Sequence, residues 1–249
     1  MTTNKPSLFE IAKVYHPALQ GDMSSSLSGA LMTEHDNTQA IQTLYQHWQK
    51  QYPEAGNRYW AARSWTLLIW QPIYLSIVAV HGCQIVLPLH RLAQHMKQGI
   101  VAGYSLAPGT WQSETEHTCL SIAARELMQM HHTFSNQCQS VFNLRPHFAS
   151  RLAADIVLSG LIRLTSIVPS ITHEHIQELA TRWLNELAWQ DESHLMIITL
   201  EDHTQHLTLD RKSCCFNYCR ANGELCSTCP KLSRDERKRR IARELSIHA

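Results

Sequence analysis

The sequence predicts an α+β fold that is predominantly helical, with short antiparallel strands and a C-terminal module ligated by cysteines. Three observations predict it. Apolar residues recur at helical spacing through most of the middle of the chain, a few short apolar runs lie between glycine and proline residues, and five of the eight cysteines fall within residues 214–229. With 249 residues, 44% of them hydrophobic, the chain can bury a large core.

The pattern divides the chain into three expected parts. Residues 1–35 are rich in serine and lack a sustained period, which predicts an irregular N-terminal lead-in. Residues 36–210 are expected to form a helical domain with short hairpins, and residues 211–249 a metal module followed by a basic terminal helix.

The first predicted helix runs from residue 36 to about residue 51. Ile41, Leu44 and Trp48 recur at helical spacing in it, and Pro53 follows its end.

An apolar stretch follows at residues 58–80. Its part at 64–80 approaches the length of about 20 apolar residues that a bilayer requires. Gln71 and Pro72 interrupt the stretch at its middle, so we expect a buried core helix, broken or kinked at Pro72. We therefore expect no transmembrane segment and at most a peripheral membrane contact.

Two short strands are predicted next, at residues 84–90 and 99–106, because both runs are rich in apolar residues and bounded by glycine or proline. Ser113 can cap a following helix, since acidic residues occupy its first turn. We expect that helix to reach the region of Asn136.

Two more helices and a hairpin lead to the cysteines. Apolar positions about one turn apart predict helices over residues 146–168 and 172–187. Residues 195–200 and 206–210 read as two strands joined by a polar turn. The second strand leads the chain directly to Cys214, so the cysteine run is expected to follow a rigid element.

The charge of the chain is unevenly distributed. From Lys231 onward there are seven cations and three anions, a net of +4, while the preceding residues carry 15 cations and 18 anions, a net of −3. Ser233 and Glu236 form a capping box that predicts a basic terminal helix. The overall balance does not indicate a nucleic-acid binder. A solvated face is the commoner role of such a helix, although it could attract an acidic electron donor, an anionic membrane or a negatively charged ferric chelate.

Motifs of the common enzyme classes are absent from the sequence. Its nine glycines contain no G-x-G, which excludes a dinucleotide fingerprint and a P-loop, and its 16 histidines form no H-E-x-x-H. No G-x-S-x-G is present either. We therefore expect no catalytic residue beyond a metal centre.

The cysteine run is the most specific signal. Cys214 and Cys215 are adjacent, and Cys226 and Cys229 follow, which gives the motif C-C-x10-C-x2-C. A disulfide framework suits a secreted protein, and no signal sequence is evident, so we expect a reducing, cytoplasmic compartment. Vicinal cysteines fit zinc poorly, but pairing Cys215 with Cys219 as C-x3-C keeps a zinc site open. An iron-sulfur cluster accepts four cysteines at looser spacing.

At these residues the chain resembles the FhuF-like ferric siderophore reductases. Proteins of that family carry a C-terminal C-C-x10-C-x2-C motif that holds a [2Fe-2S] cluster. Cys214, Cys215, Cys226 and Cys229, called the motif cysteines below, match it position by position. Cys219 departs from the pattern and could be a ligand, a free thiol or a space-filling residue; we expect it not to be a ligand.

The resemblance implies reduction of Fe(III) in a siderophore, of hydroxamate type, with release of Fe(II) in the cytoplasm. Because no nucleotide motif is present, electrons must come from an external carrier such as a reduced flavoprotein or a ferredoxin. Two alternatives remain open: a zinc-stabilised binding module with a basic terminal helix, and a general iron-sulfur electron carrier.

Overall fold

The structure, a computed structural model, describes residues 7–24, 30–109 and 111–248. The α-helices in these ranges are α1 (Leu8–Tyr15), α2 (Thr38–Gln51), α3 (Gly56–Ile77), α4 (Glu116–Gln139), α5 (Pro146–Arg163), α6 (His173–Glu186) and α7 (Arg234–His248). The strands are β1 (Gly21–Met23), β2 (Leu92–Lys97), β3 (Ile100–Leu106), β4 (Ser193–Thr199) and β5 (Gln205–Arg211).

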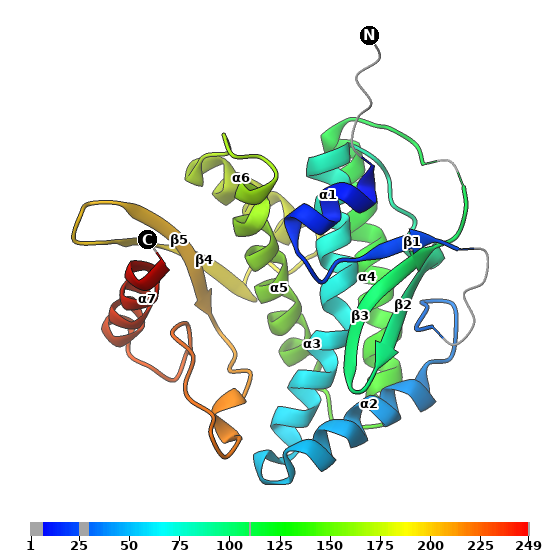
Figure 1. Cartoon of the computed structure of the whole chain (residues 1–249), viewed down its shortest axis with the longest axis horizontal. Helices are drawn as coiled ribbons and strands as arrows, with labels where there is room; N and C mark the ends of the chain where they lie inside the picture. The colour runs from blue at the N-terminus through cyan, green and yellow to red at the C-terminus, as the bar shows by residue number, and fades with distance from the viewer. Residues whose placement is uncertain (1–6, 25–29, 110, 249) are drawn as a thin grey trace.

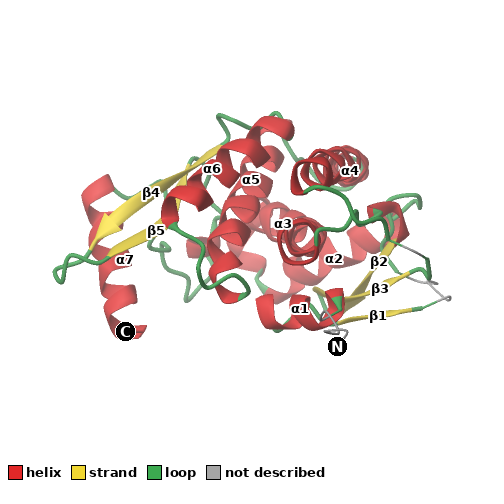
Figure 2. Cartoon of the chain, turned by 90° about the horizontal axis from the view of Figure 1, so that it is seen from above, coloured by secondary structure: helices red, strands yellow, loops and turns green. Residues whose placement is uncertain are grey.

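Helices α3, α4 and α5 lie at the centre, with a small sheet at each end of the molecule (Figures 1 and 2). One sheet has the order β1-β3-β2, in which β1 is parallel and β2 antiparallel to β3. The other is the antiparallel β4-β5 hairpin, on which α7 packs through Ile241 against Met196 and Ile198. The predominantly helical α+β fold is confirmed, with 56% of the chain helical.

Helix α3 is the core helix of the fold and does not break at Pro72. Proline has no N–H to donate to the carbonyl four residues earlier. That carbonyl, Leu68 O, instead accepts a hydrogen bond of 2.9 Å from Nε2 of the fully buried Gln94. A π-helical segment, Val78–Cys83, follows the helix. The side chain of Gln94 thus lets an unbroken helix cross the core.

The segment Pro53–Cys83 is long and apolar enough to cross a membrane by length and composition, and 67% of its most apolar window is buried inside the protein. Such burial is typical of a core helix. It agrees with the prediction of a buried core helix at this place.

The prediction of an irregular lead-in over residues 1–35 is wrong for its described part. Helix α1 begins with a capping box, in which Glu10 N donates to Ser7 Oγ and Ser7 N donates to Glu10 Oε2. Tyr15, at the other end of α1, is fully buried and donates a 2.6 Å hydrogen bond to Gly160 O. The segment therefore belongs to the core, where its contacts come from distant parts of the chain.

Residues 1–6 and 25–29 of the predicted lead-in lie outside the described residues. The division of the chain at residues 35 and 210 stays a prediction.

The strand predicted at residues 84–90 is wrong, because β2 begins only at Leu92. Pro88 removes a backbone donor from the expected strand. The next helix starts at Glu116 rather than near Ser113, and Thr115 is its N-cap. The remaining predicted helices and strands are confirmed, with ends that differ by a few residues.

His131 on α4 is buried in this core between two tryptophans. Its ring centroid lies 5.0 Å from that of Trp65 and 5.0 Å from that of Trp189. Burial lowers the pKa of His131 from 6.5 to about 4, and the neighbouring His132 adds to the shift. The folded protein therefore holds His131 neutral.

We predict a loss of stability in mild acid that depends on His131. Because the pKa of His131 is lower in the folded chain than in the unfolded chain, the unfolded chain binds more protons between pH 6.5 and pH 4. The free energy of unfolding should fall by about 2 kcal/mol between pH 7 and pH 5 from this group alone. Urea denaturation at each pH measures the change.

His131→Phe removes this part of the pH dependence, whatever its effect on absolute stability. The exposed His117 of the same helix supplies the control, since His117→Phe should keep the part of the pH dependence that comes from His131. Equal pH slopes for the wild type and His131→Phe would contradict the prediction.

Candidate metal centre

The motif cysteines follow directly from the β4-β5 hairpin. Arg211 ends β5 and pairs with Ser193 at the start of β4, so the hairpin fixes the point at which the cysteine loop begins. Ser213, just before the first cysteine, is 8% exposed. The rigid strand expected before the cysteines is therefore present.

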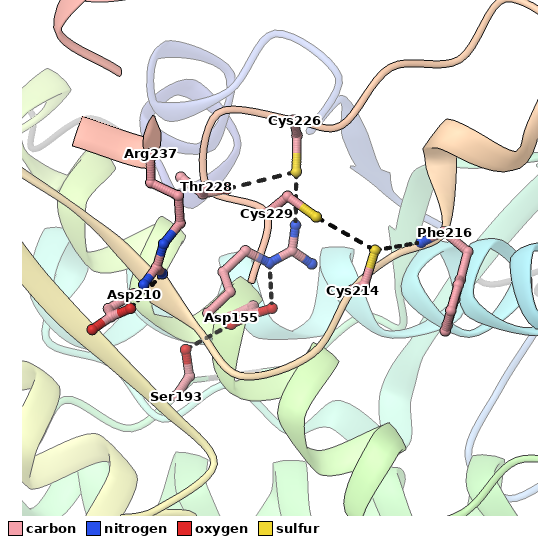
Figure 3. A network of polar contacts seen from close by, with 10 residues as sticks. Asp155, Ser193, Asp210, Cys214, Phe216, Cys226, Thr228, Cys229 and Arg237 are labelled. Atoms are coloured by element: carbon pink, nitrogen blue, oxygen red, sulfur yellow. Dashed lines mark hydrogen bonds and ion pairs between the residues drawn. The ribbon is translucent and has the colours of Figure 1, made fainter. Parts of the chain in front are cut away.

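The structure brings the four motif cysteines together, and Figure 3 shows Cys214, Cys226 and Cys229 near one another. The Sγ atoms of Cys214 and Cys229 are 3.6 Å apart. The Sγ of Cys215 lies within hydrogen-bonding reach of the thiols of Cys214 and Cys226. The vicinal pair therefore meets the C-x2-C pair in two contacts, Cys214 with Cys229 and Cys215 with Cys226. Their role as ligands stays a prediction.

This arrangement fits a [2Fe-2S] cluster, which takes four cysteine thiolates, two on each iron. Within the described residues, no group of three or more histidine, cysteine, aspartate or glutamate side chains is placed to hold a single metal ion. A structural zinc site needs four ligands around one ion. The four adjoining thiols supply the number of ligands that a two-iron cluster takes.

Donors surround the sulfur atoms. Phe216 N donates to Cys214 Sγ at 3.3 Å, and the backbone of Asn217 donates to Cys215. The hydroxyl of Thr228 lies 3.9 Å from Cys226 Sγ. Hydrogen bonds to sulfur are among the features by which a protein sets the potential of an iron-sulfur cluster.

The crowding of the thiols separates their pKa values. Hydrogen bonds from Cys214 and Cys226 lower the pKa of Cys215, and the charge of Arg211 acts in the same direction. The same hydrogen bonds, together with burial, raise the pKa values of Cys214 and Cys226. Negative charge is therefore most stable on Cys215, and several thiolates here need the positive charge of bound iron to coexist.

A buried ion pair fixes the start of the cysteine loop to helix α5. Arg211 Nε lies 2.7 Å from Oδ2 of Asp155 on α5, and Ser193 Oγ donates to Oδ1 of the same carboxylate at 2.6 Å. Arg211 Nη1 approaches Cys226 Sγ at 3.8 Å. Burial raises the pKa of Asp155, and the guanidinium offsets part of that shift. The pair thus connects the central helix to a motif cysteine.

A second set of contacts attaches the far side of the loop to the body of the protein. Arg220 lies over the ring of Tyr52, with 5.1 Å from its Cζ to the ring centroid. Ala221 N donates to Glu54 Oε1 at 2.9 Å. Nearby, the partly buried Arg63 is close enough to Cys215 for their charges to interact. Arg63 and Arg211 therefore both place positive charge near the motif cysteines.

Two backbone positions in the loop are sterically demanding. Phe216 has φ 59° and ψ 15°, the left-handed region that a bulky residue rarely adopts. At Gly223 an added Cβ would lie 2.2 Å from Asn217 O, so a side chain there would push the two arms of the loop apart. A turn lies at Asn222 and Gly223, with Gly223 N donating to Arg220 O at 2.8 Å.

Cys219 has surroundings that differ from those of the motif cysteines. It sits at the end of the 3-10 turn Asn217–Cys219, partly buried against the main core. Among the described residues, no hydrogen bond joins its sulfur to a motif thiol. Its surroundings favour a space-filling role.

The sequence missed the residues that support the loop, Arg211 and Asp155. One signal could have identified Asp155: it is an acidic residue in the apolar stretch 152–158, where an unpaired charge would be costly. Its partner could not be named, because Arg211 is 56 residues away in the chain.

We predict that Arg211→Gln destabilises the protein by about 3–5 kcal/mol, because it leaves the Asp155 carboxylate buried without its partner. Adding Asp155→Asn should restore most of the lost free energy of unfolding, as urea denaturation will measure.

The reduction potential of the iron-sulfur cluster should also fall in Arg211→Gln, since a positive charge beside the thiolates stabilises the reduced state. The control is Arg243→Gln on the exposed surface of α7, which should change neither quantity. An unchanged potential in Arg211→Gln would contradict the electrostatic role.

We predict that Cys219→Ser keeps full iron and sulfide content and an unchanged visible spectrum, because its side chain packs against the main core and shares no hydrogen bond with a motif thiol among the described residues. Cys226→Ser is the matched comparison, since it removes a thiol that contacts Cys215 and should abolish or strongly reduce the cluster. Loss of the cluster in Cys219→Ser would show that the ligand assignment is wrong.

The comparisons with known proteins agree with this geometry. The family model described as the FhuF 2Fe-2S C-terminal domain matches residues 211–231, which contain all four motif cysteines. No solved structure matches the chain. The match covers the cysteine loop and leaves the helical body outside it. Over these residues the chain is similar to the FhuF-like proteins, and it carries a [2Fe-2S] C-terminal domain of the FhuF type.

Proposed function

We propose that this protein is a ferric siderophore reductase of the cytoplasm. It would reduce Fe(III) to Fe(II) in a bound siderophore, for which the resemblance implies the hydroxamate type. The observation that carries the proposal is that the four thiols brought together by the fold are those of the FhuF 2Fe-2S domain.

The reaction does not require the protein to make or break a covalent bond. An external reductant, of the class of reduced flavoproteins or ferredoxins, gives up one electron, and the Fe(III) of the chelate gains one. Anionic oxygen donors hold Fe(II) less tightly than Fe(III), because the lower charge weakens each bond. The iron then becomes exchangeable without a catalytic acid, base or nucleophile.

The residues of the chain would position the cluster and provide positive charge beside it. The motif cysteines would hold the cluster, which supplies one-electron transfer when it is bound. Cys214, Cys215 and Cys226 are partly exposed, so electrons need to cross little protein to enter or leave. Arg211 and Arg63 would stabilise the added negative charge of the reduced state.

The proposal predicts stoichiometric electron transfer to a ferric siderophore. Anaerobically purified protein should be red-brown, and its visible bands should bleach with dithionite. After the excess dithionite is removed, a ferric hydroxamate should reoxidise the protein with one electron per cluster, and a ferrous chelator should trap the released Fe(II). Cys226→Ser protein is the control and should release little iron.

Two outcomes would favour the alternatives. A colourless protein that contains zinc would indicate a zinc-stabilised binding module. A reduced protein that is reoxidised by an oxidised ferredoxin but by none of several classes of ferric siderophore would be a general electron carrier.

A further inference from the structure

A large cavity lies beside the motif cysteines. Its volume is about 860 Å³, within the range of roughly 300–1,000 Å³ that is usual for small-molecule sites. It is formed where the starts of α3 and α5 meet α2 and the cysteine loop. Its lining residues are Tyr45, Asn57, Arg58, Ala61, Asn143, Arg145, Pro146, His147, Phe148, Arg151, Ser213 and Phe216. We call it the basic cavity.

The basic cavity adjoins the motif cysteines, because two of its lining residues are their neighbours in the chain. Ser213 and Phe216 both line it, and they flank Cys214 and Cys215 in the chain. Phe216 N donates to Cys214 Sγ, and Figure 3 shows these two residues side by side. A molecule bound in the basic cavity would therefore lie within short reach of the thiols.

The described lining of the cavity carries arginines and no acidic side chain. Arg151 is already neutralised, because its Nε lies 2.9 Å from Glu192 Oε2, and His147 contacts the other oxygen of that carboxylate. Arg58 and Arg145 are exposed, and no carboxylate of the described residues forms an ion pair with either. Two cationic groups are thus available to a ligand.

Aromatic rings complete the lining. The ring centroids of Phe148 and Phe216 are 5.9 Å apart, and Arg58 Cζ lies 5.8 Å from that of Phe216. Such a surface packs against the organic part of a ligand while arginine pairs with its carboxylate or phenolate oxygens. The cavity therefore suits a bulky organic anion.

We propose that the basic cavity binds the ferric chelate and selects chelates with a net negative charge, an inference that rests on the proposed function. Three hydroxamates cancel the charge of Fe(III), whereas catecholates, or hydroxamates that also carry free carboxylates, leave a net negative charge. Arg58 and Arg145 attract such anions and leave a neutral trihydroxamate without a charged partner. One electron then passes from the reduced protein to the Fe(III) of the bound chelate.

Binding can be measured without reduction by the use of gallium(III) chelates, because Ga(III) resembles Fe(III) in charge and size and is not reduced here. We expect the cluster-loaded protein to bind an anionic Ga(III) catecholate at least tenfold more tightly than a neutral Ga(III) trihydroxamate in isothermal titration calorimetry. Arg58→Gln and Arg145→Gln should each weaken anion binding about tenfold and leave neutral binding unchanged.

The control removes the same charge elsewhere. Arg234→Gln and Arg243→Gln lie on the exposed surface of α7, and each should change anion binding less than twofold. Equal binding of anionic and neutral chelates, or equal effects of the cavity and control substitutions, would overturn the inference.

Reoxidation kinetics separate this inference from the proposed function. With dithionite-reduced protein, the rate constant for an anionic ferric chelate should fall in Arg58→Gln and Arg145→Gln, while that for a neutral chelate should not. If ferric chelates of either charge are reduced equally fast in all variants, the cavity assignment fails and the proposed function stands. If anionic gallium chelates bind through the two arginines but no ferric chelate is reduced, the binding site stands and the reductase function fails.

Discussion

The ion pair between Arg211 and Asp155 connects the central helix α5 to the start of the cysteine loop. Asp155 is 4% exposed in the helix at the centre of the fold, and Arg211 is the last residue before the cysteine loop. Taking two charges out of water costs several kcal/mol per ion, and the cost is recovered only when the geometry and the added hydrogen bonds are good. Ser193 supplies such a bond from β4. The hairpin, the central helix and the start of the loop are thereby fixed relative to one another.

The same guanidinium also acts on the sulfur atoms. Arg211 Nη1 approaches Cys226 Sγ, and Arg63 on α3 interacts with the charge of Cys215. A cluster held by the four thiolates would be anionic and would gain a further negative charge on reduction, so these two cations favour the reduced state. The fold thus combines a structural ion pair with an electrostatic setting for electron transfer. In the basic terminal helix α7, part of the positive charge is neutralised within the protein, because Arg237 forms an ion pair with Asp210 on β5.

Local patterns in the sequence predicted most helices and the motif, because both depend on spacing within a few residues. The β2 strand was misplaced because Pro88 limits hydrogen bonding in an apolar run that otherwise resembles a strand. Helix α1 was missed although Ser7 and Glu10 form a capping box, since its burial depends on partners such as Gly160. The basic cavity could not be predicted at all. Its lining comes from three segments that are distant in the sequence.

Phe216 belongs both to the surroundings of the motif cysteines and to the lining of the basic cavity. Its left-handed backbone turns its N–H toward Cys214 while its ring lines the basic cavity. For a residue with a Cβ that conformation costs about 1–2 kcal/mol, which glycine would avoid. Glycine would keep the turn but lose the ring against Phe148 and Arg58. A strained backbone conformation persists only where the surrounding contacts stabilise it, and such conformations are frequent at functional sites. The backbone strain at Phe216 is therefore best understood as the cost of holding an aromatic ring in the wall of the basic cavity while its N–H reaches Cys214.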